Sequence, residues 1–412
     1  MTNQQKDQTY SPAVRWAGRI SGILFGVIFA WLLLEILLRI AYPALPYVLQ
    51  APLREVHVTP FTEKKILPPA VVQPDSDYQN VTRNHVDNEL QYLVPTVGMH
   101  ISTKNVMDEN SHVGFRVPDS SWEPRWPVDG VFVGDSHTFC FTEYDDCWVR
   151  RLETQYGMSV VNLGQGATGS ISHRNILMKF GLLYEPRFVV WQWYGNDMNE
   201  DYGMAVTYEG LPPVDEPNDT PAEEPRSPKG PVAEWLSANS AVYVIFDLLR
   251  SSEAERYRYN RFVDPYYFED GELAMGYGRD STMIGLDLSL EKTQIGLELG
   301  QEAIRDTKAV LDGKDIPLVM VLLPTKEEVY ARWTEPTLGA DKLATLAEGR
   351  LRMAAFCEEE GILCVDVTAE LTAAANEGVQ LFYPDDNHMN AAGNALLADV
   401  VWRFLVDAGL ME

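Results

Sequence analysis

From Gly130 onward, short apolar segments rich in β-branched residues alternate with longer segments of helical periodicity, and this alternation restricts the fold more than any other feature. The apolar segments are residues 131–133, 159–163, 188–193, 317–323 and 362–367. Helical spacing of apolar residues marks residues 171–183, 292–311, 342–359 and 391–408. Such alternation implies a parallel sheet covered on both faces. We therefore predict a three-layer α/β/α domain over residues 130–412, with a central, mainly parallel five-stranded sheet.

One long insertion interrupts this pattern at about residues 200–290. Residues 209–231 contain seven prolines, six acidic residues and two basic residues, which predicts a mobile acidic loop. Residues 233–285 are rich in Tyr and Arg and predict a small helical subdomain.

A nearly uncharged segment lies close to the N-terminus. Residues 20–34 carry no charge, and the apolar run resumes to residue 38 after Glu35. These 19 residues, at about 1.5 Å each, reach roughly 28 Å, which is close to one hydrocarbon core. A buried helix is an alternative, but such helices are rarely apolar on every face, and a cleaved signal peptide is usually shorter. We predict a transmembrane anchor over residues 20–42.

The charges around the anchor predict its orientation. Three basic residues precede the apolar run and two follow it by residue 54, which favours a cytoplasmic N-terminus over residues 1–19. The remainder of the chain then lies in the periplasm or outside the cell. It begins with a spacer and accessory segment over residues 43–129, which contains no motif that we can interpret.

Two local patterns lie near the anchor. Gly18, Gly22 and Gly26 repeat every four residues, a spacing that lets two helices approach closely and makes a homodimer a candidate. Glycine is also frequent in membrane helices, so the repeat has an ordinary explanation as well. Glu35 and Arg39 are four residues apart and are expected to pair locally.

A serine follows the first predicted strand of the domain, in the tripeptide Gly134-Asp135-Ser136. The carboxyl ends of parallel strands open into the ligand crevice of such sheets, so a turn at this position exposes the Ser136 hydroxyl. The tripeptide alone is a weak signal. It nevertheless makes Ser136 a candidate nucleophile.

Two further segments that follow strands offer hydrogen-bond donors. The glycine-rich turn at residues 164–169 lets backbone N–H groups approach a ligand oxyanion. A phosphate loop is the competing interpretation, but no Gly-Lys-Ser/Thr follows and the dinucleotide glycine spacing is absent. The side-chain amide of Asn196, after the strand at 188–193, is a second candidate donor.

A histidine flanked by acidic residues precedes the last predicted helix. Asp385 and Asp386 stand three and two residues before His388. A carboxylate so placed can hold the imidazole tautomer, which leaves the other ring nitrogen to act as general base for Ser136. Taken alone, a histidine beside acids is more often a surface or helix-entry residue. Together with the other three segments it completes the set of groups that acyl transfer needs.

With these segments in place, residues 130–412 resemble the SGNH/GDSL hydrolase superfamily. Gly134-Asp135-Ser136 resembles its first block, Gly195-Asn196-Asp197 its third, and Asp385-x-x-His388 its fifth. Residues 319–330 are also similar to a stretch in membrane-anchored SGNH-like proteins, some of them tied to polysaccharide O-acetylation. In those relatives the Asp-His pair precedes the serine, whereas here it follows.

The resemblance implies a role for each matched residue. Ser136 is the implied nucleophile and His388 the general base, oriented by Asp385 or, at the shorter spacing of some relatives, by Asp386. The implied oxyanion hole combines the backbone N–H of Ser136 with two further donors. These are Gly166, for which Ala167 is the alternative, and Asn196. No cofactor or metal is implied.

The function that we predict is that of a membrane-anchored serine esterase acting outside the cytoplasm through an acyl-enzyme. An O-acyltransferase that modifies a cell-envelope glycan shares the first half-reaction and is the main alternative. A catalytically silent envelope scaffold is the second, motivated by the glycines of the anchor and the Tyr-rich insertion.

Cysteine usage fits an oxidising compartment. The four cysteines form two local pairs, Cys140 with Cys147 and Cys357 with Cys364. Local pairing is the simplest of the three possible pairings, although four buried free thiols are the alternative.

The net charge of −27 bears on the partners. The first 42 residues contribute four bases and two acids, so the remainder carries −29. A nucleic-acid partner is excluded in practice, because phosphate contacts need clustered Lys and Arg. A polyanionic polymer would also be repelled, which favours a neutral glycan ester or a small ester as substrate.

Overall fold

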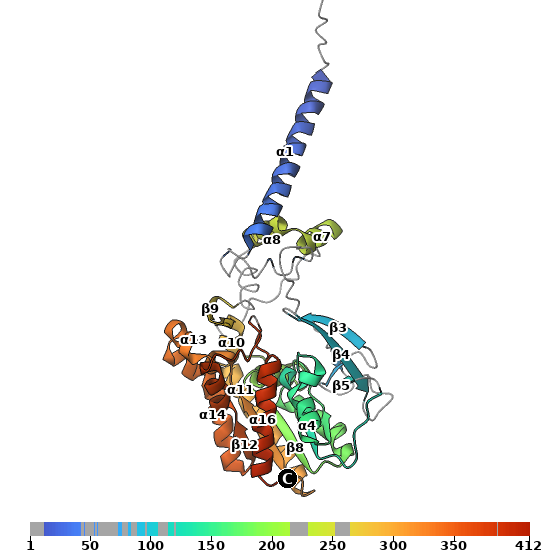
Figure 1. Ribbon diagram of the computed structural model, residues 1–412, viewed down its shortest axis with the longest axis vertical. Helices are drawn as coiled ribbons and strands as arrows, with labels where there is room; N and C mark the ends of the chain where they lie inside the picture. The colour runs from blue at the N-terminus through green and yellow to red at the C-terminus, as the bar shows by residue number, and fades with distance from the viewer. Residues whose placement is uncertain are drawn as a thin grey trace, which may run out of the picture. The chain divides into compact units, whose positions relative to one another are not determined.

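The computed structural model is shown in Figure 1. It describes residues 12–42, 45, 53, 56, 73–75, 81–83, 89–94, 97–105, 114–118, 121–214, 230–251, 264–384 and 386–412. The chain divides into two compact units, residues 1–64 with 223–256, and residues 65–222 with 257–412. Each unit is described by itself below.

A five-stranded sheet forms the centre of the second unit. Its strands are β6 (Gly130–Val133), β7 (Val160–Asn162), β8 (Phe188–Tyr194), β11 (Leu318–Leu323) and β12 (Leu363–Asp366). They run in the order β12-β11-β8-β6-β7, and every neighbouring pair is parallel. The five predicted strands and the predicted α/β class are therefore confirmed. In this order, the chain changes direction across the sheet between β6 and β8, where ligand crevices form in doubly wound sheets.

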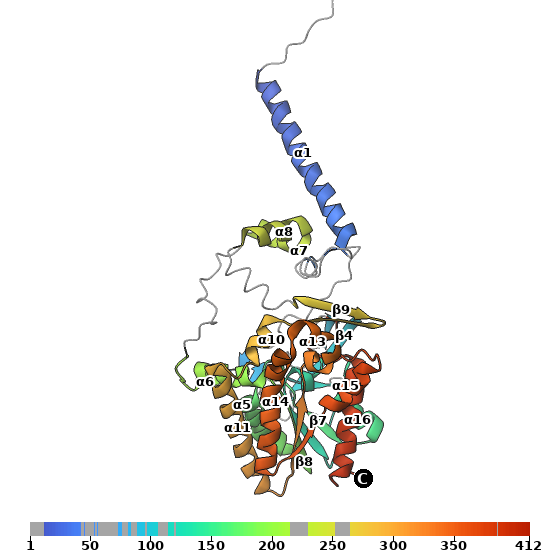
Figure 2. The same ribbon diagram turned by 90° about the vertical axis from the view of Figure 1, so that its left-hand side faces the viewer.

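Helices cover both faces of the sheet (Figure 2). One face carries α4 (Trp148–Tyr156), α15 (Thr368–Asn376) and α16 (Ala391–Asp407). The other carries α5 (Ser170–Lys179), α11 (Glu291–Asp312) and α14 (Ala340–Glu360). Four of these six helices match the four predicted helical segments to within a few residues.

Strand periodicity explains how one sheet builds two cores. In β8, Val189 and Trp191 are buried on the face of α5 and α11, whereas Phe188 and Val190 are buried on the face of α4 and α16. Each such side chain contributes about 1.5–3 kcal/mol relative to remaining exposed. Because both faces are covered, the strands appear in the sequence as continuous apolar runs.

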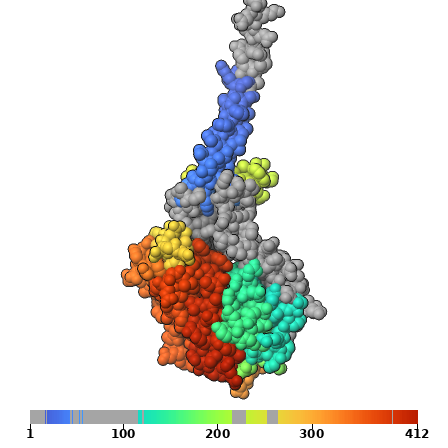
Figure 3. All heavy atoms as spheres, in the orientation of Figure 1, coloured from blue at the N-terminus to red at the C-terminus, as the bar shows by residue number. Residues whose placement is uncertain are grey.

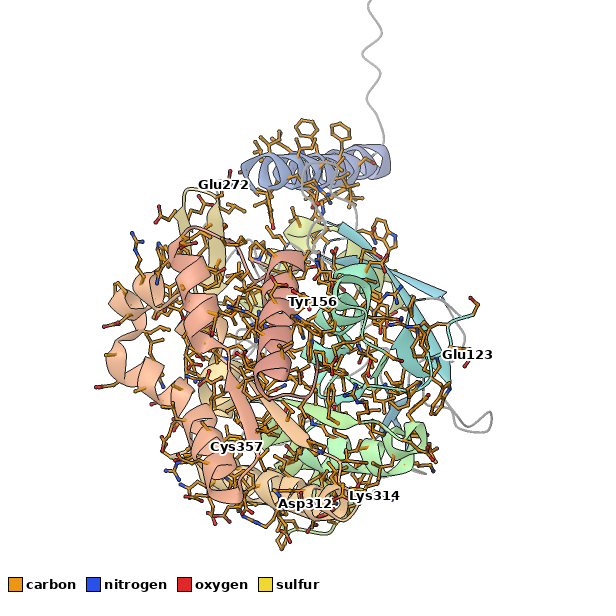
Figure 4. All side chains as sticks on the ribbon, turned by 60° about the horizontal axis from the view of Figure 1, so that its bottom comes forward. Glu123, Tyr156, Glu272, Asp312, Lys314 and Cys357 are labelled. Carbon is orange, nitrogen blue, oxygen red and sulfur yellow. A yellow bond between two sulfur atoms is a disulfide. The ribbon has the colours of Figure 1, made fainter. Side chains whose placement is uncertain are left out.

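Helices α4 and α16 lie side by side on one surface of this unit (Figure 3). Tyr156, labelled in Figure 4, stacks on Trp402 with ring centroids 4.6 Å apart. Its hydroxyl donates to Asp399 Oδ1 over 2.6 Å. This packing fixes α16, which follows the His388 loop, against the part of the chain that follows Ser136.

Five strands lie in the segment that we predicted as a spacer and accessory region. They are β1 (Gln73–Asp75), β2 (Val81–Arg83), β3 (Glu89–Val94), β4 (Val97–Asn105) and β5 (Gly114–Val117). The first two form an antiparallel pair and the other three an antiparallel sheet. At the end of this segment, Arg116 is buried and donates from Nη1 to the Phe139 carbonyl over 3.1 Å. The accessory segment therefore packs against the helix that begins with Ser136.

The insertion is only partly helical, which corrects the prediction of a helical subdomain over residues 233–285. Strands β9 (Tyr266–Asp270) and β10 (Leu273–Tyr277) form a hairpin, and α10 (Asp280–Gly285) follows it. Gly271 has a φ of 64° in the two-residue turn, beside Glu272 (Figure 4). Glycine at the first position of a two-residue turn is typical of a type II′ hairpin, and the sequence analysis overlooked this signal. The remaining elements are α3 (Ser136–Phe139), η3 (Tyr144–Asp146), η4 (Gly181–Tyr184), α6 (Asp197–Tyr208), α12 (Lys326–Val329) and α13 (Ala331–Leu338).

The first unit contains α1 (Pro12–Ala41), α7 (Pro231–Asn239) and α8 (Ala241–Arg250). Within the described residues, Gly18–Ala41 is the one single helix long and apolar enough to cross a membrane. The α7–α8 pair, bent by 113°, passes the same test when its two helices are taken together. A helix near the N-terminus that passes this test can also be a signal sequence, so the anchor and its glycine-mediated dimer stay predictions.

Candidate active site

The turn after β6 positions Ser136 at the start of α3. Asp135 caps this short helix, with Oδ1 accepting a hydrogen bond from the His137 N–H over 2.8 Å. On the neighbouring strand β8, Gln192 Oε1 accepts from the Asp135 N–H over 3.2 Å and from Thr138 Oγ1 over 2.9 Å. These contacts fix the Ser136 turn from both sides. Gln192 was not predicted, because a single polar residue inside an apolar strand has no recognisable motif.

Ser136 and His388 line the same small pocket. Its other lining residues are His137, Cys140, Phe141, Met389, Asn394 and Leu397. The His388 ring lies 4.6 Å from the Phe141 ring and 5.1 Å from the His137 ring, measured between centroids. Within the part of the chain that the structure describes, no hydrogen bond joins Ser136 to His388. Such contacts often tighten only when substrate binds.

The loop that carries His388 is closed by local hydrogen bonds. An isolated bridge pairs Phe382 with Met389, and the Tyr383 N–H donates to the His388 carbonyl over 3.1 Å. Asp386 then faces the ring, with Oδ1 lying 2.6 Å from His388 Nδ1 and accepting the His388 N–H over 3.1 Å. Asp386 is thus the carboxylate that contacts the histidine. Asp385, the first choice of the sequence analysis, lies outside the described residues.

The electrostatics of the pair suit a general base. Burial alone lowers the pKa of His388, but the charge and hydrogen bond of Asp386, aided by Asp135, outweigh it and raise this pKa above its ordinary value. Burial opposes ionisation of Asp386, yet the charge and hydrogen bonds of His388 hold the Asp386 pKa far below its usual range. Burial lowers the pKa of the neighbouring His137 to about 3. His137 is therefore neutral, and His388 is the histidine of this pocket that titrates.

One of the candidate oxyanion donors, Gly166, lies near Ser136. A Cβ built on Gly166 would lie 3.9 Å from the Ser136 Cβ, which places the Gly166 backbone beside the serine. Ala167, the alternative, is exposed and has a φ of 56°. Asn196 lies two residues beyond the end of β8, at the N-cap position of α6, but its side chain makes no capping hydrogen bond. Its Oδ1 is buried with no hydrogen-bond partner among the described residues. The geometry therefore favours Gly166 over Ala167.

A buried polar cluster supports the two donor segments, and the sequence analysis missed it. Asp197 Oδ2 lies 3.5 Å from Ser170 Oγ and 3.8 Å from His173 Nδ1. Asp201 Oδ1 accepts the backbone N–H of Ile171 over 2.8 Å. Burial raises the pKa of Asp201 to about 8, so this carboxyl binds a proton near neutral pH, and burial also raises the pKa of Asp197 well above its ordinary value. The cluster joins α5 to α6, which follow the glycine-rich turn and Asn196.

A second buried network includes Lys326, which belongs to the segment at residues 319–330. Lys326 follows β11, and its Nζ lies 3.1 Å from Asp264 Oδ2. Arg279 donates to both Asp264 oxygens, over 3.2 and 3.0 Å. The Arg279 charge also lowers the pKa of both Asp386 and His388, although more weakly than their mutual contact. The network therefore places a fixed positive charge near the base.

Two of the four cysteines are joined, as predicted for that pair. Cys140 is disulfide-bonded to Cys147, whereas Cys357 and Cys364 are free thiols. A hydrogen bond between the two free thiols, with burial, raises the pKa of Cys357. The second predicted disulfide is therefore not formed, although its two thiols are in contact (Cys357 is labelled in Figure 4). Within the described chain, no group of three or more His, Cys, Asp or Glu residues is arranged to hold a metal ion.

The geometry can be compared with known proteins at this point. Residues 287–410 match the family model described as SGNH hydrolase-like domain, acetyltransferase AlgX. The predicted resemblance to the SGNH hydrolase superfamily is confirmed. The matched range includes Asp386 and His388, whereas Ser136 lies outside it, before residue 287.

Similar chains also occur among solved structures, where 27 match. One is a lipolytic protein of the G-D-S-L family from Desulfitobacterium hafniense DCB-2, with 15% identity and a TM-score of 0.36 over 68% of this chain and 99% of that one. Another is a catalytic mutant of Axe2, an acetylxylan esterase from Geobacillus stearothermophilus, with 12% identity and a TM-score of 0.35 over 68% and 94%. No curated protein matches the sequence.

Proposed function

We propose that this protein is a membrane-anchored serine esterase of the SGNH type, which acts on an acyl or acetyl ester outside the cytoplasm. The observation that carries the proposal is one pocket lined by Ser136 and by His388, whose Nδ1 is held by Asp386 over 2.6 Å. A nucleophile beside an oriented general base is the arrangement that acyl transfer requires.

In the proposed mechanism, Ser136 Oγ attacks the acyl carbonyl and its proton passes to His388 Nε2. Asp386 keeps the opposite ring nitrogen protonated and stabilises the imidazolium that forms. The backbone N–H groups of Ser136 and Gly166 and the Asn196 amide bind the oxyanion. The tetrahedral intermediate then expels the alcohol, which takes the proton from His388. Water, activated by the same base, releases the acid and regenerates Ser136.

A second function shares this acyl-enzyme. In an O-acetyltransferase, a sugar hydroxyl replaces water in the second step, and the match to the AlgX acetyltransferase model favours this alternative. Purified protein given an acyl donor with and without a glycan acceptor separates the two. Ester formation on the glycan that outcompetes release of free acid indicates a transferase, whereas acid release unchanged by the acceptor indicates a hydrolase. The charge of −29 beyond the first 42 residues supports a neutral glycan rather than a polyanion.

Two observations support the proposed location. The apolar helix Gly18–Ala41 supplies the length for one span, and the basic residues before it favour a cytoplasmic N-terminus. The Cys140–Cys147 disulfide fits an oxidising compartment.

A membrane-impermeant fluorophosphonate tests nucleophile and location together. Spheroplasts that carry the full chain are expected to label at Ser136 from outside, and His388→Ala is expected to abolish the labelling, because the base activates the serine. Labelling that appears only after lysis would contradict the proposed orientation. Folded protein that never labels would favour the silent scaffold.

The pH dependence of turnover is expected to follow His388. Only the neutral imidazole accepts the serine proton, so kcat/KM is lost as the pH falls through the His388 pKa and is full above it. Since Asp386 raises this pKa, the acid limb should lie above the ordinary histidine value of about 6.5. A pH–rate profile of kcat/KM measures the pH at which this acid limb lies. An acid limb well below about pH 6.5 would show that His388 is not the general base.

A further inference from the structure

The start of α8 is held by the one acidic residue of α1. Glu35 Oε1 accepts the Ala241 N–H over 2.9 Å, and Oε2 accepts from the Val242 N–H over 3.1 Å and from Ser240 Oγ over 2.9 Å. A carboxylate from α1 thus caps the N-terminus of α8, where backbone N–H groups lack partners within their own helix. The insertion therefore folds back onto the apolar helix.

Arg39 completes this junction. It pairs with Glu35 over 2.5 Å, as predicted from their spacing, and its Nη2 also donates to the carbonyl of Asn239 over 2.9 Å. Glu35 and Arg39 thus bind the bend between α7 and α8. Glu35 lies six residues before Ala41, the last residue of α1, which corresponds to about 9 Å along the helix.

One face of α8 packs against α1. Ala241, Val244 and Ile245 form a small core with Leu38 and Tyr42. These three residues share a face because they are three or four positions apart. Figure 2 shows α7 and α8 beside the C-terminal end of α1.

Two pairs of apolar residues, one on α8 and one on α7, remain exposed. Phe246 and Leu249 of α8 are 49% and 72% exposed, and Val232 and Trp235 of α7 are 71% and 63% exposed. Each pair is three residues apart and so lies on one side of its helix. We call these four residues the interfacial face.

We propose that the interfacial face binds a lipid bilayer, at the headgroup boundary where α1 leaves the hydrocarbon. The inference rests on the proposed membrane anchor. The Glu35 contact holds the start of α8 level with a point about 9 Å before the end of α1, and helices that lie in a membrane interface bury their apolar face about 5–10 Å deep. No protein partner is needed to cover these side chains, because the anchor already brings lipid to them.

The residues of this segment suit that depth. Trp235 is of the type enriched at membrane interfaces, where an apolar ring can keep its N–H near water. The Arg250 guanidinium lies 5.2 Å from the Phe246 ring centroid, so its alkyl stem can cover apolar surface while its charge reaches the headgroups. The insertion would then give the chain a second attachment to the membrane besides α1.

Depth-dependent fluorescence quenching tests this proposal on the full chain in phosphatidylcholine vesicles. Cys357→Ser and Cys364→Ser remove the free thiols, and an environment-sensitive dye is then attached at Trp235→Cys or Leu249→Cys. Both labels are expected to emit at shorter wavelength than in water. Both should be quenched more strongly by lipids with a nitroxide near the headgroup than by lipids with one near the chain end.

Two further labels serve as controls. Glu234→Cys lies beside Trp235 and is exposed on a different side of α7, so its label should stay accessible to aqueous quencher. Ile28→Cys, in the middle of the apolar helix, should be quenched most by the deep nitroxide, and its failure would refute the anchor separately. Labels at residues 235 and 249 that respond only to aqueous quencher would overturn the proposal. Blue-shifted emission without nitroxide quenching would also overturn it, since a second copy or another protein would then cover the face.

Discussion

Ser136→Ala is expected to lower kcat/KM for a short-chain aryl ester by about four to six orders of magnitude. Without the hydroxyl no acyl-enzyme forms, and only binding and the oxyanion donors remain to assist attack by water. The loss should appear in kcat, because the serine side chain is small and contributes little to substrate binding. Steady-state kinetics on purified full-length protein measure both constants.

The matched control is Ser289→Ala, which changes an exposed serine outside the pocket and should leave the rate unchanged. Combining Ser136→Ala with His388→Ala should cost no more than Ser136→Ala alone, because residues that act as a unit are not additive. Full turnover by Ser136→Ala would show that Ser136 is not the nucleophile and that the proposed mechanism is wrong. Additive losses would mean that His388 acts on some other group.

The central sheet could be predicted because four of its five strands are fully buried. Burial leaves β11 as an unbroken apolar run, so the strand is recognisable without any tertiary information. The accessory strands lack such runs. Residues 97–101, within β4, do carry apolar residues at alternate positions, but the sequence analysis did not interpret this pattern. Arg116, in β5, is buried where the carbonyls of Phe139 and Thr142 accept its hydrogen bonds. Such a buried charge depends on contacts between segments that are far apart in the sequence.

In the candidate site, too, residues in local motifs could be predicted, whereas residues that act through distant contacts could not. Ser136 and His388 stand in short local motifs, so the sequence could propose both, and the structure places both in one pocket. The sequence favoured Asp385 over Asp386 by its spacing from His388 alone, but the distance from a carboxylate to the ring depends on how the loop closes. The supporting residues, Asp197 and Arg279, act through partners far away in the chain and leave no pattern in sequence.

Asp386→Asn is expected to lower kcat by about 10³–10⁴-fold, whereas Asp385→Asn should leave it nearly unchanged. An amide at residue 386 can donate to His388 Nδ1 and so favour the tautomer whose Nε2 carries the proton and cannot accept another. It also removes the negative charge that raises the His388 pKa. The acid limb of the pH–rate profile should therefore move to lower pH in Asp386→Asn and stay in place in Asp385→Asn.

These paired variants decide which acid orients the base, because the two substitutions are chemically identical and differ by one position. If kcat falls in Asp385→Asn and not in Asp386→Asn, the 2.6 Å contact of Asp386 is only structural, and Asp385 is the acid that orients His388. If Asp386→Asn combined with His388→Ala is slower than His388→Ala alone, Asp386 acts on more than the imidazole. If the double variant is no slower than His388→Ala alone and the acid limb of Asp386→Asn moves to lower pH, Asp386 acts by orienting His388.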